Sequence, residues 1–454
     1  MKRMVAVFLA LALLAGLVSC RQAATPTVTP SAPSSSSIPS SSETPSSSEQ
    51  SSSEDSSETE SSSSSENLEV IPSSPETESS TPNNSEPEPP VQTEPEPATY
   101  NYQKLTDIQK VYYKSMLKAA ENMQPGWITL GEATADFRSD IAVVRNALSL
   151  DNPQIFWLPL YYATATASAQ GEKQVAVMYF SRSPEEDPSY LVTRSEKENM
   201  QRKLSAAIDS ICAKVTATDP YEIELQLHDL LCAQVTYTAF SESNDPMIYT
   251  AYGALVNGRA VCEGYSRAMQ LLLSRFSIKS VLVTGVANNE GHIWNAVQLD
   301  GKWYHLDVTW DDTQAEYISH EYFNLDDALI KIDHIINKNY YELTKDELSS
   351  GEKSFNIEVP VCDGTQDYYF NRSGFVFAPE GEEAFAKHIV KKGSVVIEAV
   401  FSDYNFKESF GADDQNYIAK INRILSEKHT AYKFRIAKYY ISEKVLTLIM
   451  ESKS

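Results

Sequence analysis

The sequence predicts an α+β fold in which a helix beginning at a cysteine packs on an antiparallel sheet that carries a histidine and an aspartate. Three observations lead to this prediction. A glycine-containing turn precedes Cys262, and an amphipathic helical pattern follows it to Phe276. Residues 279–287 are rich in strand-forming residues. An Asp-Gly pair at 300–301 then separates two alternating apolar runs, which is a strong signal for a tight hairpin.

Residues 1–20 predict a cleaved leader. Lys2 and Arg3 form a positive start, and residues 5–14 form an apolar run that is too short to span a bilayer as a helix. The ending LVSC at 17–20 resembles a bacterial lipobox, and the resemblance implies that Cys20 is acylated and becomes the first mature residue. The alternative is plain secretion with Cys20 discarded. The preferred interpretation places the protein outside the cytoplasm, anchored to the bacterial cell membrane by lipid.

Residues 21–100 are predicted to form a disordered tether. Ser, Pro, Thr and Glu dominate this stretch, which holds 14 acidic residues and one basic residue. Such a composition cannot bury enough apolar surface to offset the conformational entropy of folding. The formal net charge of the whole chain is -24, and the excess of acid extends into the part that folds. An acidic body argues against nucleic acid as a partner.

The flanks of the central segment predict further α+β regions. Thr106 with Gln109 forms a capping-box pattern, Ser195 with Glu198 is expected to start another helix, and Asp219-Pro220 a third. In the tail, residues 393–402 are expected to form a strand, 413–428 a helix, and 432–442 with 444–451 a closing hairpin. The predicted organisation is a signal peptide at 1–20, a tether at 21–100, an α+β region at 101–200, a central domain at 201–349 and a small α+β domain at 350–454.

Cys262 is the candidate nucleophile. Its predicted place at a helix N-terminus puts it near unpaired backbone N–H groups and the positive end of the helix dipole. Both favour a thiolate, which is the reactive form of cysteine. A buried, unreactive cysteine is the alternative that this stretch leaves open.

The predicted hairpin supplies a histidine and a carboxylate. A two-residue loop at Asp300-Gly301 pairs positions whose numbers sum to 601, so His292 is expected opposite Thr309 and Trp294 opposite Asp307. His292 and Asp307 are then diagonal neighbours on one face, within hydrogen-bonding reach. A carboxylate that orients an imidazole is what a cysteine–histidine pair requires.

Other histidines and cysteines receive structural interpretations. His305 falls on the same face and is the rival base, but the pattern gives it no diagonal carboxylate, and it is expected to be a half-exposed strand residue. Asp311 and Asp312 are expected in a turn. His228 and Cys232, four apart on a predicted helix, are interpreted as a surface histidine and a core cysteine rather than a shared metal site. The remaining histidines lie in segments without a matching nucleophile; they are His320, His334, His388 and His429.

These motifs resemble the transglutaminase-like superfamily. The resemblance rests on YGAL at 252–255, VCEGY at 261–265, GHIWN at 291–295 and WYHLDVTW at 303–310, with YFNL at 322–325 as a continuation. It implies a papain-like α+β core, with Cys262 as nucleophile, His292 as base and Asp307 as the orienting acid. Val308 departs from the family pattern, in which proline often follows the acid.

The resemblance implies a cell-surface thiol enzyme that acts on protein or peptide amides, including substrates associated with the cell wall. A thioester forms on the cysteine, and its fate depends on the acceptor: an amine gives a crosslink, and water gives deamidation or peptide hydrolysis. The alternative is a non-catalytic surface module that keeps the fold for binding. No cofactor and no metal site are expected, because the five cysteines include no paired metal-binding motif.

Overall fold

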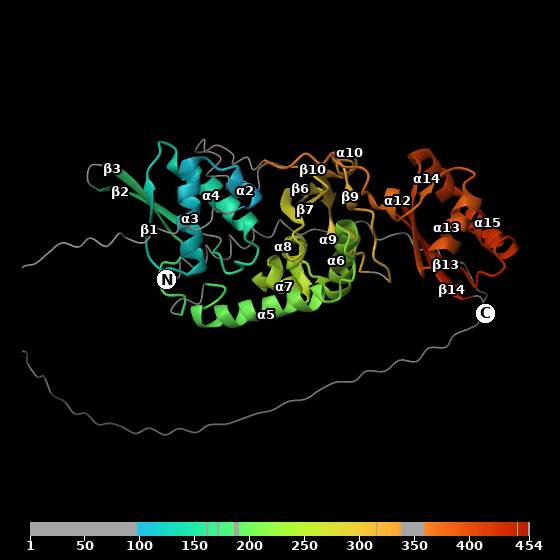
Figure 1. The fold of residues 1–454 in the computed structure, drawn as a ribbon, viewed down its shortest axis with the longest axis horizontal. Helices are drawn as coiled ribbons and strands as arrows, with labels where there is room; N and C mark the ends of the chain where they lie inside the picture. Colours follow the sequence, from blue (N-terminus) through green and yellow to red (C-terminus); the bar gives the residue numbers. More distant parts are fainter. Residues whose placement is uncertain are drawn as a thin grey trace, which may run out of the picture. The chain divides into compact units, whose positions relative to one another are not determined.

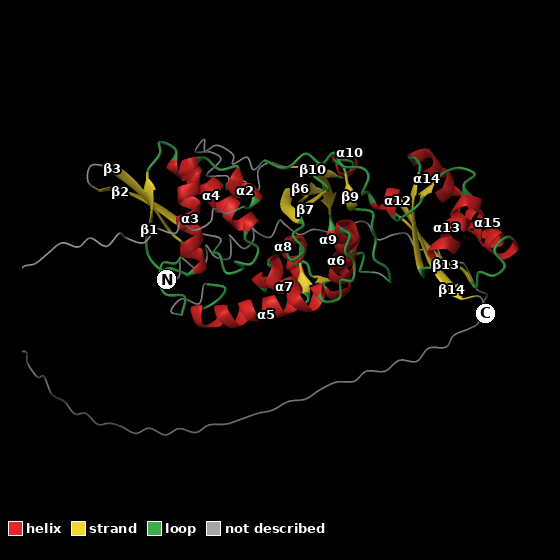
Figure 2. Ribbon diagram, viewed as in Figure 1, coloured by secondary structure: helices red, strands yellow, loops and turns green. Residues whose placement is uncertain are grey.

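The computed structural model describes residues 98–159, 162–169, 172–185, 190–314, 316–336, 358–442 and 444–452. The predicted signal peptide with Cys20, and nearly all of the predicted tether, lie outside the described residues. Figures 1 and 2 show a mixture of helices and sheets along the rest of the chain. No helix in the described ranges has the length and apolar character that crossing a bilayer requires.

The first part of the chain packs helices against a three-stranded antiparallel sheet of order β1-β3-β2. The predicted capping box is confirmed: the Thr106 side chain accepts from the backbone of Gln109, whose side chain accepts from the Thr106 backbone in return. The elements are α2 (Tyr100–Gln103), α3 (Asp107–Glu121), β1 (Ile128–Glu132), α4 (Phe137–Asp151), β2 (Ala163–Ala169), β3 (Glu172–Met178) and α5 (Arg194–Cys212).

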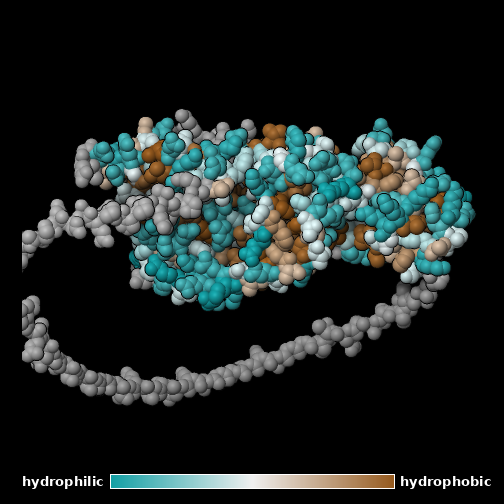
Figure 3. Space-filling model, viewed as in Figure 1, coloured by the Kyte–Doolittle hydropathy of each residue, from teal (hydrophilic) through white to brown (hydrophobic). Residues whose placement is uncertain are grey.

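The helix predicted with Ser195 as its N-cap begins two residues earlier than expected. Thr193 is its N-cap and forms a capping box with Glu196, so the pair Ser195 and Glu198 was the wrong choice of cap. Two overlapping Ser/Thr-x-x-Glu patterns occur here, and Thr193 is the one whose extended backbone leads into the helix. The exposed side of α5 is hydrophilic in Figure 3.

The central part is a five-stranded antiparallel sheet of order β10-β6-β7-β8-β9, with α8 packed on β6 and β7. Asp219 caps α6 with Pro220 in its first turn, as predicted. The elements are α6 (Pro220–Gln234), β4 (Thr236–Tyr237), η1 (Phe240–Glu242), η2 (Pro246–Tyr249), α7 (Ala251–Leu255), β5 (Arg259–Ala260), α8 (Cys262–Ser274), β6 (Lys279–Ala287), β7 (Glu290–Leu299), β8 (Lys302–Leu306), α9 (Val308–Asp311), β9 (Phe323–Leu325), α10 (Asp327–Ile330) and β10 (His334–Ile336).

The β7–β8 hairpin has the predicted turn and register over its length. Asp300 and Gly301 both have positive φ, +47° and +80°, as a type I′ turn requires. The pairing runs from Leu299 with Lys302 to Asn295 with Leu306. The predicted pairs beyond that point are wrong, because the strand ends at Leu306 and the next residue begins a helix.

The last part of the chain has an apolar core of its own, built between a four-stranded sheet of order β11-β12-β14-β13 and three helices. The expected strand, helix and closing hairpin are all present, and most of the described aromatic side chains in this part are buried. The elements are α12 (Tyr369–Arg372), β11 (Val376–Phe377), α13 (Glu382–Lys392), β12 (Val396–Phe401), α14 (Tyr404–Ala412), α15 (Asp414–Glu427), β13 (Phe434–Ile441) and β14 (Val445–Ser452).

Candidate active site

Cys262 is the first residue of α8, preceded by an extended N-cap at Val261. As predicted, this cysteine therefore lies beside the unpaired backbone N–H groups of the first helical turn. Gly264 in the same turn lies so close to the preceding segment that a Cβ there would be 2.5 Å from the carbonyl oxygen of Ile248. Glycine at this position lets the start of the helix pack tightly and fixes where the thiol lies.

Ser266 and Asn295 attach the start of α8 to β7. The Ser266 hydroxyl is 2.9 Å from the carbonyl oxygen of Cys262 and 3.0 Å from that of Ile293. The Asn295 side-chain amide donates to the Ser266 carbonyl at 3.0 Å. All of these contacts are buried, so they hold the cysteine helix in one position against the strand that carries His292.

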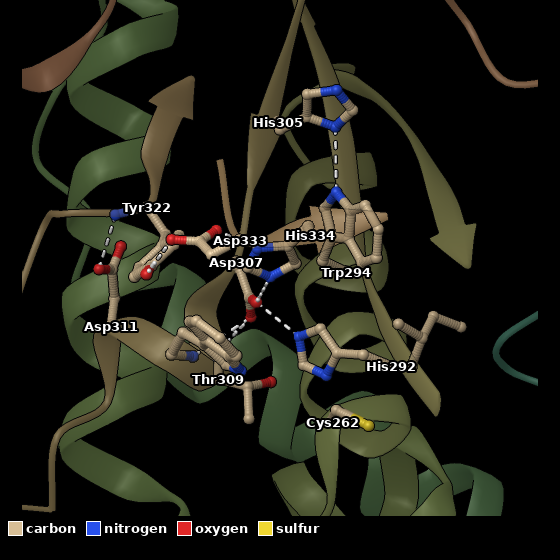
Figure 4. Close-up of polar contacts among 12 residues, drawn as sticks. Cys262, His292, Trp294, His305, Asp307, Thr309, Asp311, Tyr322, Asp333 and His334 are labelled. Atoms are coloured by element: carbon tan, nitrogen blue, oxygen red, sulfur yellow. Dashed lines mark hydrogen bonds and ion pairs between the residues drawn. The ribbon is translucent and has the colours of Figure 1, made fainter. Parts of the chain in front are cut away.

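His292 and Asp307 form a buried pair. Nε2 of His292 lies 2.5 Å from Oδ2 of Asp307, and Figure 4 shows the ring between that carboxylate and Cys262. Burial opposes a charge on the ring, but the charge of Asp307, its hydrogen bond and a further contribution from Cys262 raise the pKa of His292 well above its usual value. Burial likewise opposes a charge on Asp307, yet His292 and His334 hold the pKa of this carboxyl well below its usual range. The charged form of the pair is therefore favoured at neutral pH.

Asp307 reaches His292 by a route that strand pairing did not predict. It is the N-cap of α9, and its Oδ1 accepts from the backbone N–H groups of Thr309 at 3.0 Å and Trp310 at 3.2 Å. One carboxylate oxygen thus binds the helix, and the other is left for His292. Capping the helix fixes the side chain more tightly than a place on a strand would, because the backbone itself holds it.

His334 is a third member of this cluster that the sequence reasoning missed. Its Nε2 lies 3.2 Å from the same Asp307 oxygen that binds His292, and its Nδ1 lies 2.6 Å from Oδ1 of Asp333. A carboxylate only accepts hydrogen bonds, so the His334 ring lies between two acceptors, Asp307 and Asp333. Strand β10 approaches closely at Gly285, where a Cβ would be 2.1 Å from the carbonyl oxygen of Ile335.

His305 is buried, so the expected half-exposed position is wrong. Its Nδ1 accepts from the indole N–H of Trp294 at 3.0 Å, and its Nε2 lies 3.1 Å from Oδ1 of Asp327. Strand pairing predicted no carboxylate beside His305, but Asp327 of α10 supplies one. The Trp294 ring in turn stacks on His292, with centroids 5.8 Å apart. His305 therefore supports the tryptophan beside the site and does not contact Cys262 in Figure 4.

Asp311, Asp312 and His228 are more buried than the sequence predicted. Asp311 lies in α9 rather than in a turn and is fully buried, and Asp312, the C-cap of that helix, is 5% exposed. His228 is fully buried in α6 and is not a surface residue. Apolar periodicity gave no indication of these buried polar groups, because their partners come from segments distant in the sequence.

Cys262 itself has no solvent exposure. It packs in a small apolar cluster with Leu282, Ile293 and Leu150, the last of which lies at the end of α4. The guanidinium of Arg267 in α8 also donates to the carbonyl of Ser149 at 2.6 Å. The first part of the chain thus covers the thiol, and a substrate must displace part of this cover to reach it.

A helix that begins at a cysteine and faces a histidine–aspartate pair on an antiparallel sheet places the central part among papain-like α+β domains. The particular family follows from comparison: residues 209–308 match the model of the transglutaminase-like superfamily. The chain therefore contains a transglutaminase-like domain over that stretch, in agreement with the resemblance seen in the motifs. A search of curated protein sequences gave no match.

Three solved structures are similar to parts of the chain. One, "Crystal structure of a TGase", has 14% identity and a TM-score of 0.23, covering 32% of this chain and 43% of its own. A candidate cysteine protease from Cytophaga hutchinsonii has 14% identity and a TM-score of 0.20, with coverages of 33% and 65%. A candidate protease from Parabacteroides distasonis has 7% identity and a TM-score of 0.21, with coverages of 64% and 62%. The chain spans less than two thirds of each of these proteins.

Proposed function

We propose that this protein is a thiol enzyme that acts on protein or peptide amides through Cys262, His292 and Asp307. The observation that carries the proposal is the buried 2.5 Å contact between His292 and Asp307 beside a cysteine at a helix N-terminus. A fixed carboxylate keeps the imidazole oriented, and the imidazole keeps the thiol ionised.

In the proposed reaction, the thiolate of Cys262 attacks the carbonyl carbon of an amide, and the C–N bond breaks. The leaving ammonia or amine takes its proton from the His292 imidazolium, which leaves a thioester on the sulfur and a neutral imidazole. The neutral ring then takes a proton from the acceptor, either water or an amine, as it attacks the thioester. The C–S bond breaks, and the Cys262 thiolate and the His292 imidazolium are restored. The backbone N–H of Cys262 is the proposed donor to the oxyanion in both steps.

The direct test is a screen of acyl-donor peptides with detection of released ammonia, run with and without an added primary amine. Ammonia release without amine incorporation indicates deamidation, and incorporation indicates crosslinking. Cleaved peptide backbone indicates proteolysis. A folded Cys262→Ala variant is the control for each reaction, and release at the same rate in that variant would contradict the proposal.

A non-catalytic binding module is the second candidate. The complete burial of Cys262 favours it, because a thiol under a cover of apolar side chains is not open to substrate. The extracytoplasmic location and the lipid anchor at Cys20 are proposed for either function on the basis of the leader sequence alone.

We expect Leu150→Ala to speed the alkylation of Cys262 by small thiol reagents. The substitution removes the side chain that α4 contributes to the cover over the thiol. Leu148→Ala is the matched control, because Leu148 is equally buried on the same helix but packs in the main core. Both variants should lose about 2–5 kcal/mol of stability. Equal alkylation rates in the two would show that α4 does not control access to the thiol.

We expect His334→Gln to lower kcat by about 10- to 100-fold, the range that corresponds to losing one hydrogen bond to a charged group. His334 holds the oxygen of Asp307 that His292 uses, so its loss leaves the carboxylate less firmly placed. The comparison is His388→Gln, which changes a histidine on α13, outside this cluster. An unchanged kcat in folded His334→Gln would show that His334 does not help to position the Asp307 carboxylate.

A further inference from the structure

A second histidine cluster lies apart from the thiol. His228 and Asp229 are neighbours on α6, and His320 comes from the segment between α9 and β9. Oδ1 of Asp229 lies 2.9 Å from Nδ1 of His228 and 3.0 Å from Nε2 of His320. The three residues offer ligand atoms that are all within 4.8 Å of one another. Two imidazoles and a carboxylate converge here on one point.

A second, buried carboxylate lies beside the outer nitrogen of each ring. Nε2 of His228 lies 3.3 Å from Oδ2 of Asp311, and Nδ1 of His320 lies 2.5 Å from Oε2 of Glu398. Asp311 is fully buried and Glu398 is 5% exposed. Metal-binding histidines almost always donate their second N–H to a carboxylate or carbonyl in this way, which fixes the tautomer and the ring orientation.

The spacing of the inner atoms suits a small divalent ion. Bonds of about 2.0–2.2 Å in tetrahedral geometry put neighbouring ligand atoms roughly 3.4 Å apart. The two distances from Oδ1 of Asp229, 2.9 and 3.0 Å, need to open by only a few tenths of an ångström, and the two ring nitrogens lie within 4.8 Å of each other. A cation would replace the two N–H groups that now donate to Asp229, and the 44% exposed Asp229 side chain gives it a route in.

Two other groups of possible ligands do not have both rings supported by a second carboxylate. Cys232 Sγ lies 4.0 Å from Nε2 of His228, which is the outer nitrogen, and it donates instead to the carbonyl of Val308. His305, in a group with Asp327 and Cys362, accepts from Trp294 through its other nitrogen. Within the described part of the chain, the His305 ring has one carboxylate neighbour, Asp327, whereas His228 and His320 each have two.

We propose that His228, Asp229 and His320 bind one divalent transition-metal ion of the zinc class, with water completing the coordination. Asp311 and Glu398 orient the two histidine ligands. Because Glu398 belongs to β12 and the ligands to the central part, the ion joins the transglutaminase-like domain to the last part of the chain. The site is independent of the proposed catalytic reaction.

The test uses the full chain after treatment with a chelator, in a Cys262→Ala background so that the candidate active site offers no thiol ligand. Zn²⁺ affinity is measured by competition with a chromophoric chelator, and Co²⁺ is added to record its d–d absorption. We expect one ion per chain, a Co²⁺ spectrum of low coordination number, and a Tm that rises with Zn²⁺ concentration.

Asp229→Asn and His320→Gln should each abolish tight binding, whereas Glu398→Gln, which keeps all three ligands, should weaken it by about 10- to 100-fold. His334→Gln removes a histidine of the other cluster and should bind like the parent. Circular dichroism checks the fold of each variant. The proposal is overturned if the parent binds no Zn²⁺ at micromolar concentration, or if folded His320→Gln binds as tightly as the parent. Loss of binding in His334→Gln alone would place the ion at the candidate active site and also overturn the proposal.

Discussion

Cys262→Ala is expected to lower turnover of any amide substrate by about 10⁴-fold or more while leaving the fold intact. The thiol is the only group in the proposed mechanism that forms a covalent bond with the acyl carbon, so nothing else replaces it. The substitution keeps a small side chain at the first position of α8. Initial rates on the best peptide from the screen measure the effect, with circular dichroism as the folding check.

The matched control for this variant is Cys232→Ala. Cys232 is also buried and also lies on a helix, but its sulfur contacts His228 and Val308 instead of the candidate pair. It should keep nearly full activity. A folded Cys262→Ala protein that retains activity, or a Cys232→Ala protein that loses it, would place the nucleophile elsewhere.

His292→Ala is expected to be nearly as severe, again about 10⁴-fold or more in kcat, because the thiol then loses its base and the leaving amine loses its proton donor. The two losses should not add in the double variant, since the groups act as one unit. The rate is measured across pH to exclude a simple shift of the optimum.

His305→Gln is the comparison for that result. His305 is a buried histidine on the next strand, and glutamine retains an acceptor for the indole N–H of Trp294. We expect most of the activity to remain, together with a loss of stability of about 1–3 kcal/mol from the weakened hydrogen bonds. If His305→Gln were inactive and His292→Ala active, the assignment of the base would be reversed.

The hairpin illustrates what local sequence determines. The Asp-Gly turn and the alternation around it predicted the register from 295 to 306 correctly, because both depend on neighbours within a few residues. Asp307 contacts the predicted partner, His292, but it does not do so as a strand residue. The strand ends before it, and the aspartate reaches His292 as a helix cap.

The residues that were missed are those whose partners lie far along the chain. His334 comes 42 residues after His292 in the sequence, and it joins the site only because β10 pairs with β6 on the far edge of the sheet. His320 likewise contacts a residue far along the chain, Glu398 of β12, which comes 78 residues later. A periodic pattern carries no information on such pairings, since it reports which face is apolar and not which polar groups meet.

The central claim is that His292 ionises the thiol of Cys262, and the pH dependence of alkylation at this residue tests it most directly. The rate of iodoacetamide modification is followed on the Cys262 peptide by mass spectrometry, in the wild type and in His292→Gln. The shape of each profile is compared rather than its absolute rate, so slow access through the cover affects both proteins alike.

The raised pKa of His292 determines how the alkylation rate should depend on pH. An imidazole that stays protonated through neutral pH stabilises the thiolate, so the wild-type rate should change little between about pH 5 and 7. In His292→Gln the thiol should titrate near or above its ordinary pKa of about 8.5, and the rate should fall about tenfold per pH unit over the same range. A wild-type profile that falls as steeply as that of His292→Gln would contradict the claim.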